Sequence, residues 1–454
     1  MKPLASEYAE YIANESFKNL PESVILQAKK SILDTIGAAL TSHGDESCQI
    51  LIQFIAGLRG SQEATIFTKK RIKVPAINAA LANGFCANAL EMDDGHRFGV
   101  VHPGAVVVPS AIAAAEMIQT DGKNLLQGIV VGYEVMLRIA KVSGPSMMKR
   151  GLAPTGIVTP FGAAAAAGKI LNLNREEITH GLALAGTQGG GVLELVKEGF
   201  ITKSLNPAKA AMAGLFSALL AEKGLTGPET ILEGENGFFR ALMSDEIESK
   251  DLTAGLGGDY EICRTYTKFY ASCRHTHAAI DCTLEIVRKY QIKSEQIDDI
   301  TVGTYPTAVD FGARRVHPGS ITDSKFSIPF CVALAIIKGN VSVEVFTEDN
   351  LRDEDLIQLS SRVKVYEEKR WTNVFPGKRG ATVEIRMLDG RILREEVELA
   401  KGEPESPATW DEISQKFRSN SARYLENHNS KKLEYLVLNI EEHTVDEITA
   451  ILRR

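Results

Sequence analysis

Residues 90–116, LEMDDGHRFGVVHPGAVVVPSAIAAAE, place a polar loop rich in Asp and His between two apolar segments. The flanking segments at 72–92 and 106–120 are rich in Ala and predict helices, and their small residues allow neighbouring helices to approach closely. Loops held between rigid elements often carry binding or catalytic groups. We therefore expect a packed helical scaffold that presents a functional loop.

Helical patterns dominate the chain outward from this loop. Val24–Leu40 has apolar residues at helical spacing, and 123–145 and 204–225 also predict helices. Asn174 and Glu177 have the spacing of a capping box, which marks the start of a further helix. The first half of the chain is thus predicted to be helical.

The composition changes near residue 260. The β-branched run DDITVGTYP at 298–306 is the first clear strand signal, and alternating patterns predict strands at 362–367 and 381–387. Asp389-Gly390 before ILREEVEL indicates a hairpin.

The chain returns to helical patterns near its C-terminus. Helices are expected at 409–424 and 429–452, and GEPESP at 402–407 reads as a linker. The predicted fold is mainly α: a large all-helical part, a smaller α+β insert and a short helical tail.

The composition restricts the class of protein. A chain of 454 residues suggests two or three domains, and a net charge of -7 argues against general binding to nucleic acid or a membrane surface. The six cysteines form no CxxC pair, and neither a signal peptide nor a run of about 18 apolar residues is expected. We expect a cytoplasmic protein with reduced thiols.

Several motifs in a fixed order carry a family resemblance. They are SILDTIGAAL near residue 35, LEMDDGH and HPG at 90–104, PTG and FGAAAAAGKILNL at 154–173, TKSLNPAKAA from 202, SCRHTHAAID at 272–281 and KFSIPFCVALAI at 325–336. Together they resemble the MmgE/PrpD family, which includes 2-methylcitrate dehydratase, cis-aconitate decarboxylase and iminodisuccinate epimerase.

The resemblance covers nearly the whole chain and implies a domain organisation. It implies an all-helical domain from 1–262 and 405–454 and an α+β lid domain at 263–404, with the active site between them. It also implies a homodimer that acts on a small carboxylate without a cofactor or metal.

Proton removal next to a carboxylate leaves a dianionic, enolate-like species. A positioned base must take the proton, and fixed donors or cations must stabilise the charge that develops. Lys, Arg and His can supply this positive charge. The turn GTQGGG at 186–191 lacks the preceding strand and the GxGxxG order of a dinucleotide site, so we expect a close-packed turn.

The loop at 90–104 holds three carboxylates and two imidazoles. Asp93 and Asp94 are adjacent, with Glu91 nearby, so burial should raise the pKa of one of them and make it a candidate base. The alternatives are an exposed acidic loop or an Asp that caps the next helix. His102 is the stronger histidine candidate, and His96 is either a substrate contact or a surface side chain; the loop lacks the HxxxH or HExxH spacing of a zinc site.

Two later motifs supply basic groups. Lys203 precedes a predicted helix, where it would bind a substrate carboxylate together with the helix N-terminus. His277 matches the family histidine, His275 is a substrate contact, and Arg274 either binds a carboxylate or pairs with an acid such as Asp281.

Four positions depart from the pattern that the resemblance implies. Ala153 stands where a histidine is frequent, and Phe330 where a tyrosine is common. Glu91 replaces an Asp, and Gly95 replaces Thr or Ser. The first two changes remove groups that could carry a proton.

The leading hypothesis is a cofactor-independent lyase, a dehydratase or decarboxylase acting on a small di- or tricarboxylic acid. The alternatives are an epimerase or isomerase of a small dicarboxylate and a catalytically silent anion-binding protein. The expected catalytic residues are Asp93, His102, Lys203 and His277, and the expected substrate contacts are Glu91, Asp94, His96, Arg274 and His275.

Overall fold

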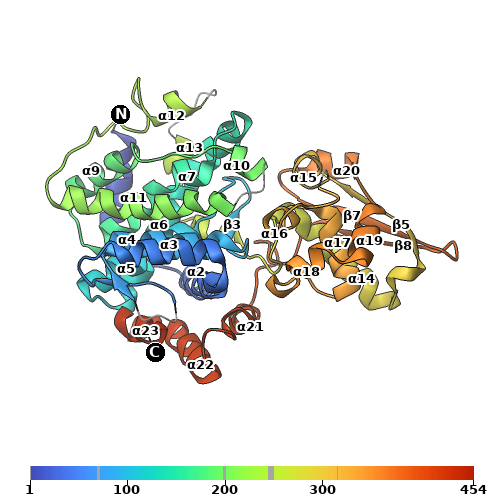
Figure 1. Ribbon diagram of the computed structural model, residues 1–454. Helices are drawn as coiled ribbons and strands as arrows, with labels where there is room; N and C mark the ends of the chain where they lie inside the picture. Colours follow the sequence, from blue (N-terminus) through green and yellow to red (C-terminus); the bar gives the residue numbers. More distant parts are fainter. Residues whose placement is uncertain (1, 69–71, 198–200, 244–249, 314, 454) are drawn as a thin grey trace.

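The computed structural model describes residues 2–68, 72–197, 201–243, 250–313 and 315–453. Figure 1 shows a large helical body beside a smaller body that contains a sheet. Each body has its own cluster of buried apolar side chains, so each has a separate hydrophobic core. The fold is mainly α with a smaller α+β part, as the sequence predicts.

The helical body is formed largely by the first part of the chain. Its helices are α1 (Leu4–Asn14), α2 (Glu22–Thr41), α3 (Glu46–Gly57), α4 (Ala76–Ala89), α5 (Gly104–Ile118), α6 (Gly122–Lys149), α7 (Pro154–Val158), α8 (Pro160–Ile170), α9 (Arg175–Ala185), α10 (Glu194–Lys197), α11 (Leu205–Glu222), α12 (Phe238–Leu242) and α13 (Lys250–Thr253). The predicted capping box is present at the start of α9, between Asn174 and Glu177.

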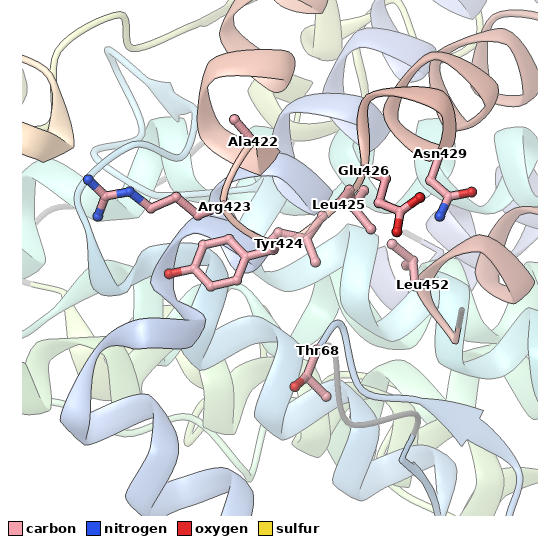
Figure 2. A pocket seen from close by; sticks show the side chains of 9 residues that line it. Thr68, Ala422, Arg423, Tyr424, Leu425, Glu426, Asn429 and Leu452 are labelled. Carbon is pink, nitrogen blue, oxygen red and sulfur yellow. The ribbon is translucent and has the colours of Figure 1, made fainter.

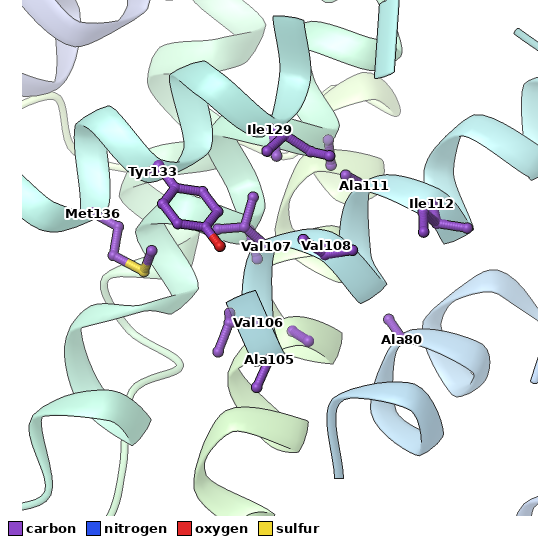
Figure 3. Packing of buried hydrophobic residues seen from close by; sticks show 14 of the residues in the cluster. Ala80, Ala105, Val106, Val107, Val108, Ala111, Ile112, Ile129, Tyr133 and Met136 are labelled. Carbon is purple, nitrogen blue, oxygen red and sulfur yellow. The ribbon is translucent and has the colours of Figure 1, made fainter. Parts of the chain in front are cut away.

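Helix α5 lies at the centre of this body and is buried almost all round. Figure 3 shows Val106, Val107 and Val108 of α5 packed beside Tyr133 and Met136 of α6. A helix that is apolar on every side needs neighbours on every side. Helices α4, α6, α8 and α11 supply them.

Small residues allow these neighbours to come close. A Cβ at Gly84 of α4 would lie 2.8 Å from the Ala105 carbonyl oxygen and 3.2 Å from the Ala208 Cα of α11. A Cβ at Gly214 of α11 would lie 2.5 Å from the Pro160 carbonyl oxygen of α8. The position of α11, and of the lysine just before it, is therefore fixed by backbone contacts.

The C-terminal tail packs back onto the helical body (Figure 1), as α21 (Trp410–Ser421), α22 (Asn427–Leu438) and α23 (Val445–Leu452). The buried Lys416 of α21 pairs with Asp34 of α2 at 2.5 Å. The prediction of one helix at 429–452 is wrong, because α22 ends at Leu438 and Thr444 caps a separate helix.

The smaller body contains a four-stranded sheet in the order β6-β5-β7-β8. Its strands are β5 (Ile297–Thr304), β6 (Val363–Glu367), β7 (Ala381–Met387) and β8 (Ile392–Val397). Its helices are α14 (His277–Tyr290), α15 (Pro306–Gly312), α16 (Ile321–Ser324), α17 (Ile328–Lys338), α18 (Glu348–Leu351), α19 (Glu354–Ser361) and α20 (Lys369–Val374). Strands β7 and β8 form the predicted hairpin, with Gly390 at φ 89° in its turn.

A two-stranded ladder lies where the chain passes from one body to the other. Strand β3 (Gly95–His96), in the polar loop, pairs antiparallel with β4 (Thr265–Tyr266). The first ladder of the chain, β1 (Ala64–Thr65) with β2 (Lys73–Val74), is equally short. The β3–β4 pairing brings the acidic loop against the segment that precedes α14.

Two further predictions concern the domain boundaries and membrane-spanning helices. The domain boundaries at 262 and 405 stay a proposal, which the two apolar clusters support because one gathers side chains from 4–262 and 408–452. None of the helices in the described ranges is long and apolar enough to cross a bilayer.

Candidate active site

A cavity of about 110 Å³ lies between the two bodies. The helical body contributes Asn88, Val100, His102, Met148, Ala153, Pro154, Thr155, Leu193, Lys203, Asn206 and Pro207, and the α+β body contributes Cys273, His275, Phe311 and Phe326. His102 of the acidic loop lines this cavity, and the buried Glu91 and Asp93 pair with Lys203 and His102 in its wall, so we take it as the candidate active site.

Two larger cavities lie elsewhere on the helical body. One, of about 360 Å³, lies beside the C-terminal helices, where Figure 2 shows Arg423, Tyr424 and Glu426 around it. The other, of about 480 Å³, adjoins the start of α9. Neither contains any of the residues expected to act on a substrate.

Glu91 and Lys268 form a buried ion pair next to Lys203. Glu91 pairs with Lys203 and accepts a hydrogen bond of 2.9 Å from Lys268 Nζ. Burial alone would raise the pKa of Glu91, but the two lysines and His102 outweigh burial and hold that pKa well below its ordinary value. Glu91 has φ 58°, the left-handed conformation that commonly follows the end of a helix, here α4.

Asp93 lies behind His102. Its Oδ2 atom is 3.0 Å from His102 Nδ1 and accepts a hydrogen bond of 2.8 Å from Asn88. Burial alone would raise the pKa of Asp93, but His102 and Lys268 outweigh it and the pKa is lowered. The carboxylate therefore holds Nδ1 of the imidazole and leaves Nε2 to the cavity, an arrangement suited to a general base.

Lys203 lies at the end of a 3₁₀ turn, Ile201–Ser204, directly before α11. Its Nζ is 5.6 Å from the centre of the Phe326 ring in the α+β body. The next residue, Ser204, donates to Asn88, the same side chain that supports Asp93. Lysine, imidazole and carboxylate thus share one hydrogen-bonded frame at the α4–α11 contact.

Neither Asp94 nor His96 lines the cavity, so their roles as substrate contacts stay predictions. Asp94 accepts hydrogen bonds from the Gly104 backbone at the start of α5 and from Tyr133, so it caps the helix, and burial raises its pKa to about 7. The expected raised carboxyl pKa therefore falls on a structural residue. His96 is 1% exposed and lies 3.4 Å from Glu261, so it is not a surface side chain.

Some residues of the motif at 272–281 line the cavity, and others are buried away from it. His275 lines the cavity and its Nδ1 lies 2.7 Å from the Tyr305 hydroxyl; burial and the charges of Arg379, Lys268 and Arg274 lower its pKa to about 3. It contributes a neutral imidazole.

Arg274 and His277 are buried and bind other groups of the protein. Arg274 binds Glu403 at 2.8 Å, where Asp281 was the expected alternative partner, and also donates to His277 Nδ1. His277 is fully buried and its Nε2 lies 3.2 Å from the Ser272 carbonyl oxygen. Neither side chain lines the cavity, so their roles in binding or catalysis stay predictions.

The positions that depart from the family pattern have different surroundings. Ala153 lines the cavity, so its lack of a proton-carrying group matters there. Phe330 lies in the apolar core of the smaller body, away from the cavity. Gly95 is required by packing, because a Cβ there would lie 2.3 Å from the Tyr266 hydroxyl.

Sequence reasoning missed Lys268. It is 1% exposed, contacts Glu91 and lies 4.0 Å from Asp93; these two carboxylates outweigh burial and raise its pKa. The residue stands four positions before the SCRH motif, in a segment with no other signal. No cluster of three or more His, Cys, Asp or Glu side chains suited to a metal ion occurs within the described ranges.

Fold and site together define a two-part, mainly helical enzyme with a lysine and a carboxylate-supported imidazole facing one cavity. Two family models match the chain: the MmgE/PrpD N-terminal domain over residues 6–250 and the MmgE/PrpD C-terminal domain over residues 270–442. The protein belongs to the MmgE/PrpD family.

Several curated relatives are similar to this chain over most of its length. A cis-aconitate decarboxylase-like protein of Aspergillus oryzae is 24% identical, covering 99% of this chain and 97% of its own length. Human cis-aconitate decarboxylase is 25% identical, with 97% and 92% covered. A mitochondrial 2-methylcitrate dehydratase of Yarrowia lipolytica is 22% identical, with 86% and 78% covered. These are lyases, so the prediction of an MmgE/PrpD-type lyase is confirmed at the level of the family.

Proposed function

We propose that this protein is a cofactor-independent lyase that acts on a small di- or tricarboxylic acid by proton transfer next to a carboxylate, with loss of water or CO2. The observation that carries the proposal is the cavity where Lys203 and His102 meet, with Asp93 behind the imidazole. The decarboxylase and dehydratase relatives support the class of reaction.

In the proposed mechanism Lys203 binds a substrate carboxylate, which replaces the Glu91 carboxylate as its partner. His102 Nε2 then takes the adjacent proton, and Asp93, 3.0 Å from Nδ1, stabilises the imidazolium that forms. The ammonium groups of Lys203 and Lys268 stabilise the charge on the enolate-like species. In a dehydration, the hydroxyl of the neighbouring carbon then leaves with the proton held by His102, as water, and the double bond forms. In a decarboxylation, the electron pair of the C–C bond to the departing CO2 forms the enolate-like species instead, and a protonated His102 donates its proton to that carbon.

The test is turnover of a panel of small carboxylic acids, followed by product analysis. Lys203→Ala should lower turnover about 100-fold or more, because it removes the cation that faces the developing charge. Lys209→Ala is the matched control, since Lys209 is an exposed lysine on α11 outside the cavity. Unchanged turnover in Lys203→Ala would contradict the proposal, as would a panel in which no acid reacts, the behaviour of a silent binder.

Epimerisation is the second candidate, because it needs only removal and return of one proton. It is supported by the two imidazoles of His102 and His275 in the cavity lining, because inversion needs proton removal on one face of the carbon and proton return on the other. Reaction in deuterated water, followed by NMR, separates the two. Deuterium in the recovered substrate, without any elimination product, indicates an epimerase.

We further infer a cytoplasmic homodimer. The six cysteines are unpaired, as expected in a reducing compartment. Helix α3 and Leu58, the residue that follows it, expose Ile50, Phe54 and Leu58 in one row, with 62%, 63% and 52% of their surfaces accessible. Such a row on a helix of a folded protein is typical of a surface that pairs with another chain.

A further inference from the structure

The walls of the candidate cavity are largely apolar. Met148, Ala153 and Leu193 line it on the helical side, and Phe311 and Phe326 line it on the other. A wall of this kind excludes a third carboxylate, because a charge buried without a partner is strongly disfavoured.

The helical wall is fixed in place by backbone hydrogen bonds. Ala153 N donates to the Gly191 carbonyl oxygen at 3.1 Å, and Leu193 N donates to the Gly151 carbonyl oxygen at 2.9 Å. The segment 151–153 therefore lies beside 191–193, and the Ala153 and Leu193 side chains cannot readily turn away from a ligand.

One cation lines the cavity. In the part of the chain that the structure describes, Lys203 is the one lysine or arginine that lines the cavity, and Glu91 pairs with it. Lys268 lies against Glu91 and Asp93, and the buried Lys325 interacts electrostatically with Glu91, but neither of these lysines lines the cavity. A ligand with three carboxylates therefore meets one ammonium group at the cavity wall, too few to compensate its charge.

The volume of the cavity limits the size of the ligand. The cavity holds about 110 Å³, so a ligand with a shorter carbon skeleton leaves less of itself outside the cavity.

We propose, as an inference that rests on the proposed function, that the substrate is a compact dicarboxylate with a hydrocarbon substituent and not a tricarboxylate. One carboxylate lies at Lys203 beside His102. The second meets the neutral donors of Thr155 and Asn206, which also line the cavity. The hydrocarbon group packs against Met148, Ala153 and Leu193.

Calorimetric titration with three probes tests this inference: succinate, 2-methylsuccinate and tricarballylate. The added methyl group of 2-methylsuccinate should tighten binding about 4-fold over succinate, the gain expected from burying one methyl group. Tricarballylate should bind at least about 10-fold more weakly than 2-methylsuccinate, since its third carboxylate meets the apolar wall.

Two variants of one wall residue form a matched pair. Ala153→Ser places a hydroxyl in the wall and should reduce the preference for 2-methylsuccinate over tricarballylate. Ala153→Val keeps the wall apolar and should retain the order of affinities. Both are small changes, and the order measured for the unaltered protein is a test that does not depend on either variant.

Tightest binding of tricarballylate by the unaltered protein would overturn the inference, and so would equal binding of succinate and 2-methylsuccinate. Titration of Lys203→Ala separates this failure from failure of the proposed function. If binding depends on Lys203 but tricarballylate binds tightest, only the substrate class is wrong. If Lys203→Ala changes nothing, or no acid binds, the proposed function fails as well.

Discussion

At the scale of single residues, neighbouring carboxylates of the acidic loop have different partners and different roles. Asp93 pairs with His102 and keeps a lowered pKa, whereas Asp94, one position on, caps α5 and has its pKa raised to about 7 by burial. The difference arises because Asp93 has cationic neighbours, while the partners of Asp94 are an amide and a hydroxyl.

The raised pKa of Asp94 predicts a dependence of stability on pH. Between pH 3.8 and about 7 the unfolded chain releases this proton while the folded protein retains it, so the free energy of unfolding falls as pH rises through that window. Asp94→Asn removes this titration. The free energy of unfolding of the variant relative to the wild type should therefore rise by about 1–4 kcal/mol between pH 4 and pH 8.

Urea unfolding at several pH values measures this difference. Asp298→Asn is the control for loss of a carboxylate, because Asp298 is exposed on β5. A difference between Asp94→Asn and wild type that stays constant with pH would show that Asp94 is not a buried, protonated carboxyl.

Sequence motifs predicted the residues that combine at the cavity, Asp93, His102 and Lys203, because each stands in a recognisable segment. Lys268 could not be found that way. Its role depends on contact with Glu91, 177 positions earlier in the chain, and that contact follows from the docking of the two bodies.

At the scale of elements, the position of Lys203 depends on how closely α11 approaches its neighbours. The absence of a side chain at Gly214 permits backbone contact with α8, since a Cβ there would lie 2.5 Å from the Pro160 carbonyl oxygen and 2.3 Å from the Ala163 Cβ. Backbone atoms within a packed helix cannot move aside as a flexible side chain can.

Gly214→Ala should therefore lower the free energy of unfolding by about 1–3 kcal/mol, although alanine favours helices. Gly57→Ala is the matched control, because a Cβ at Gly57, the last residue of α3, meets nothing within 4 Å. Denaturant unfolding compares the two. Equal or greater stability of Gly214→Ala would contradict the close α8–α11 contact.

Elements with strong local signals were predicted well, and short ones were not. The periodic helix at α2 and the Asp389-Gly390 hairpin match the structure. The two-residue strands β3 and β4 have no signal of their own, because they exist only through their pairing across 170 residues. The break between α22 and α23 was hidden by continuous amphipathic spacing, although Thr444 and Glu447 form a capping box there.

At the scale of the whole molecule, two bodies with separate cores meet at the cavity, and the apolar row on α3 lies on the helical body. Because the row is both apolar and exposed, we expect it to be covered by a second copy.

The dimer proposal predicts a mass in solution of twice 49.4 kDa by light scattering. Phe54→Asp should shift the protein toward the monomer, because it places a charge in the apolar row. Leu388→Asp, in the exposed turn of the β7–β8 hairpin, should not. A monomeric wild-type protein, or a Phe54→Asp variant that stays fully dimeric, would contradict the proposed interface.

The proposed mechanism depends on a carboxylate held by Lys203 beside the imidazole of His102. A crystal structure of the protein with bound 2-methylsuccinate measures this directly. We predict a ligand carboxylate oxygen within about 3 Å of Lys203 Nζ, with a carbon-bound hydrogen next to that carboxylate facing His102 Nε2. A ligand bound outside the cavity, with Lys203 still paired to Glu91, would contradict the account.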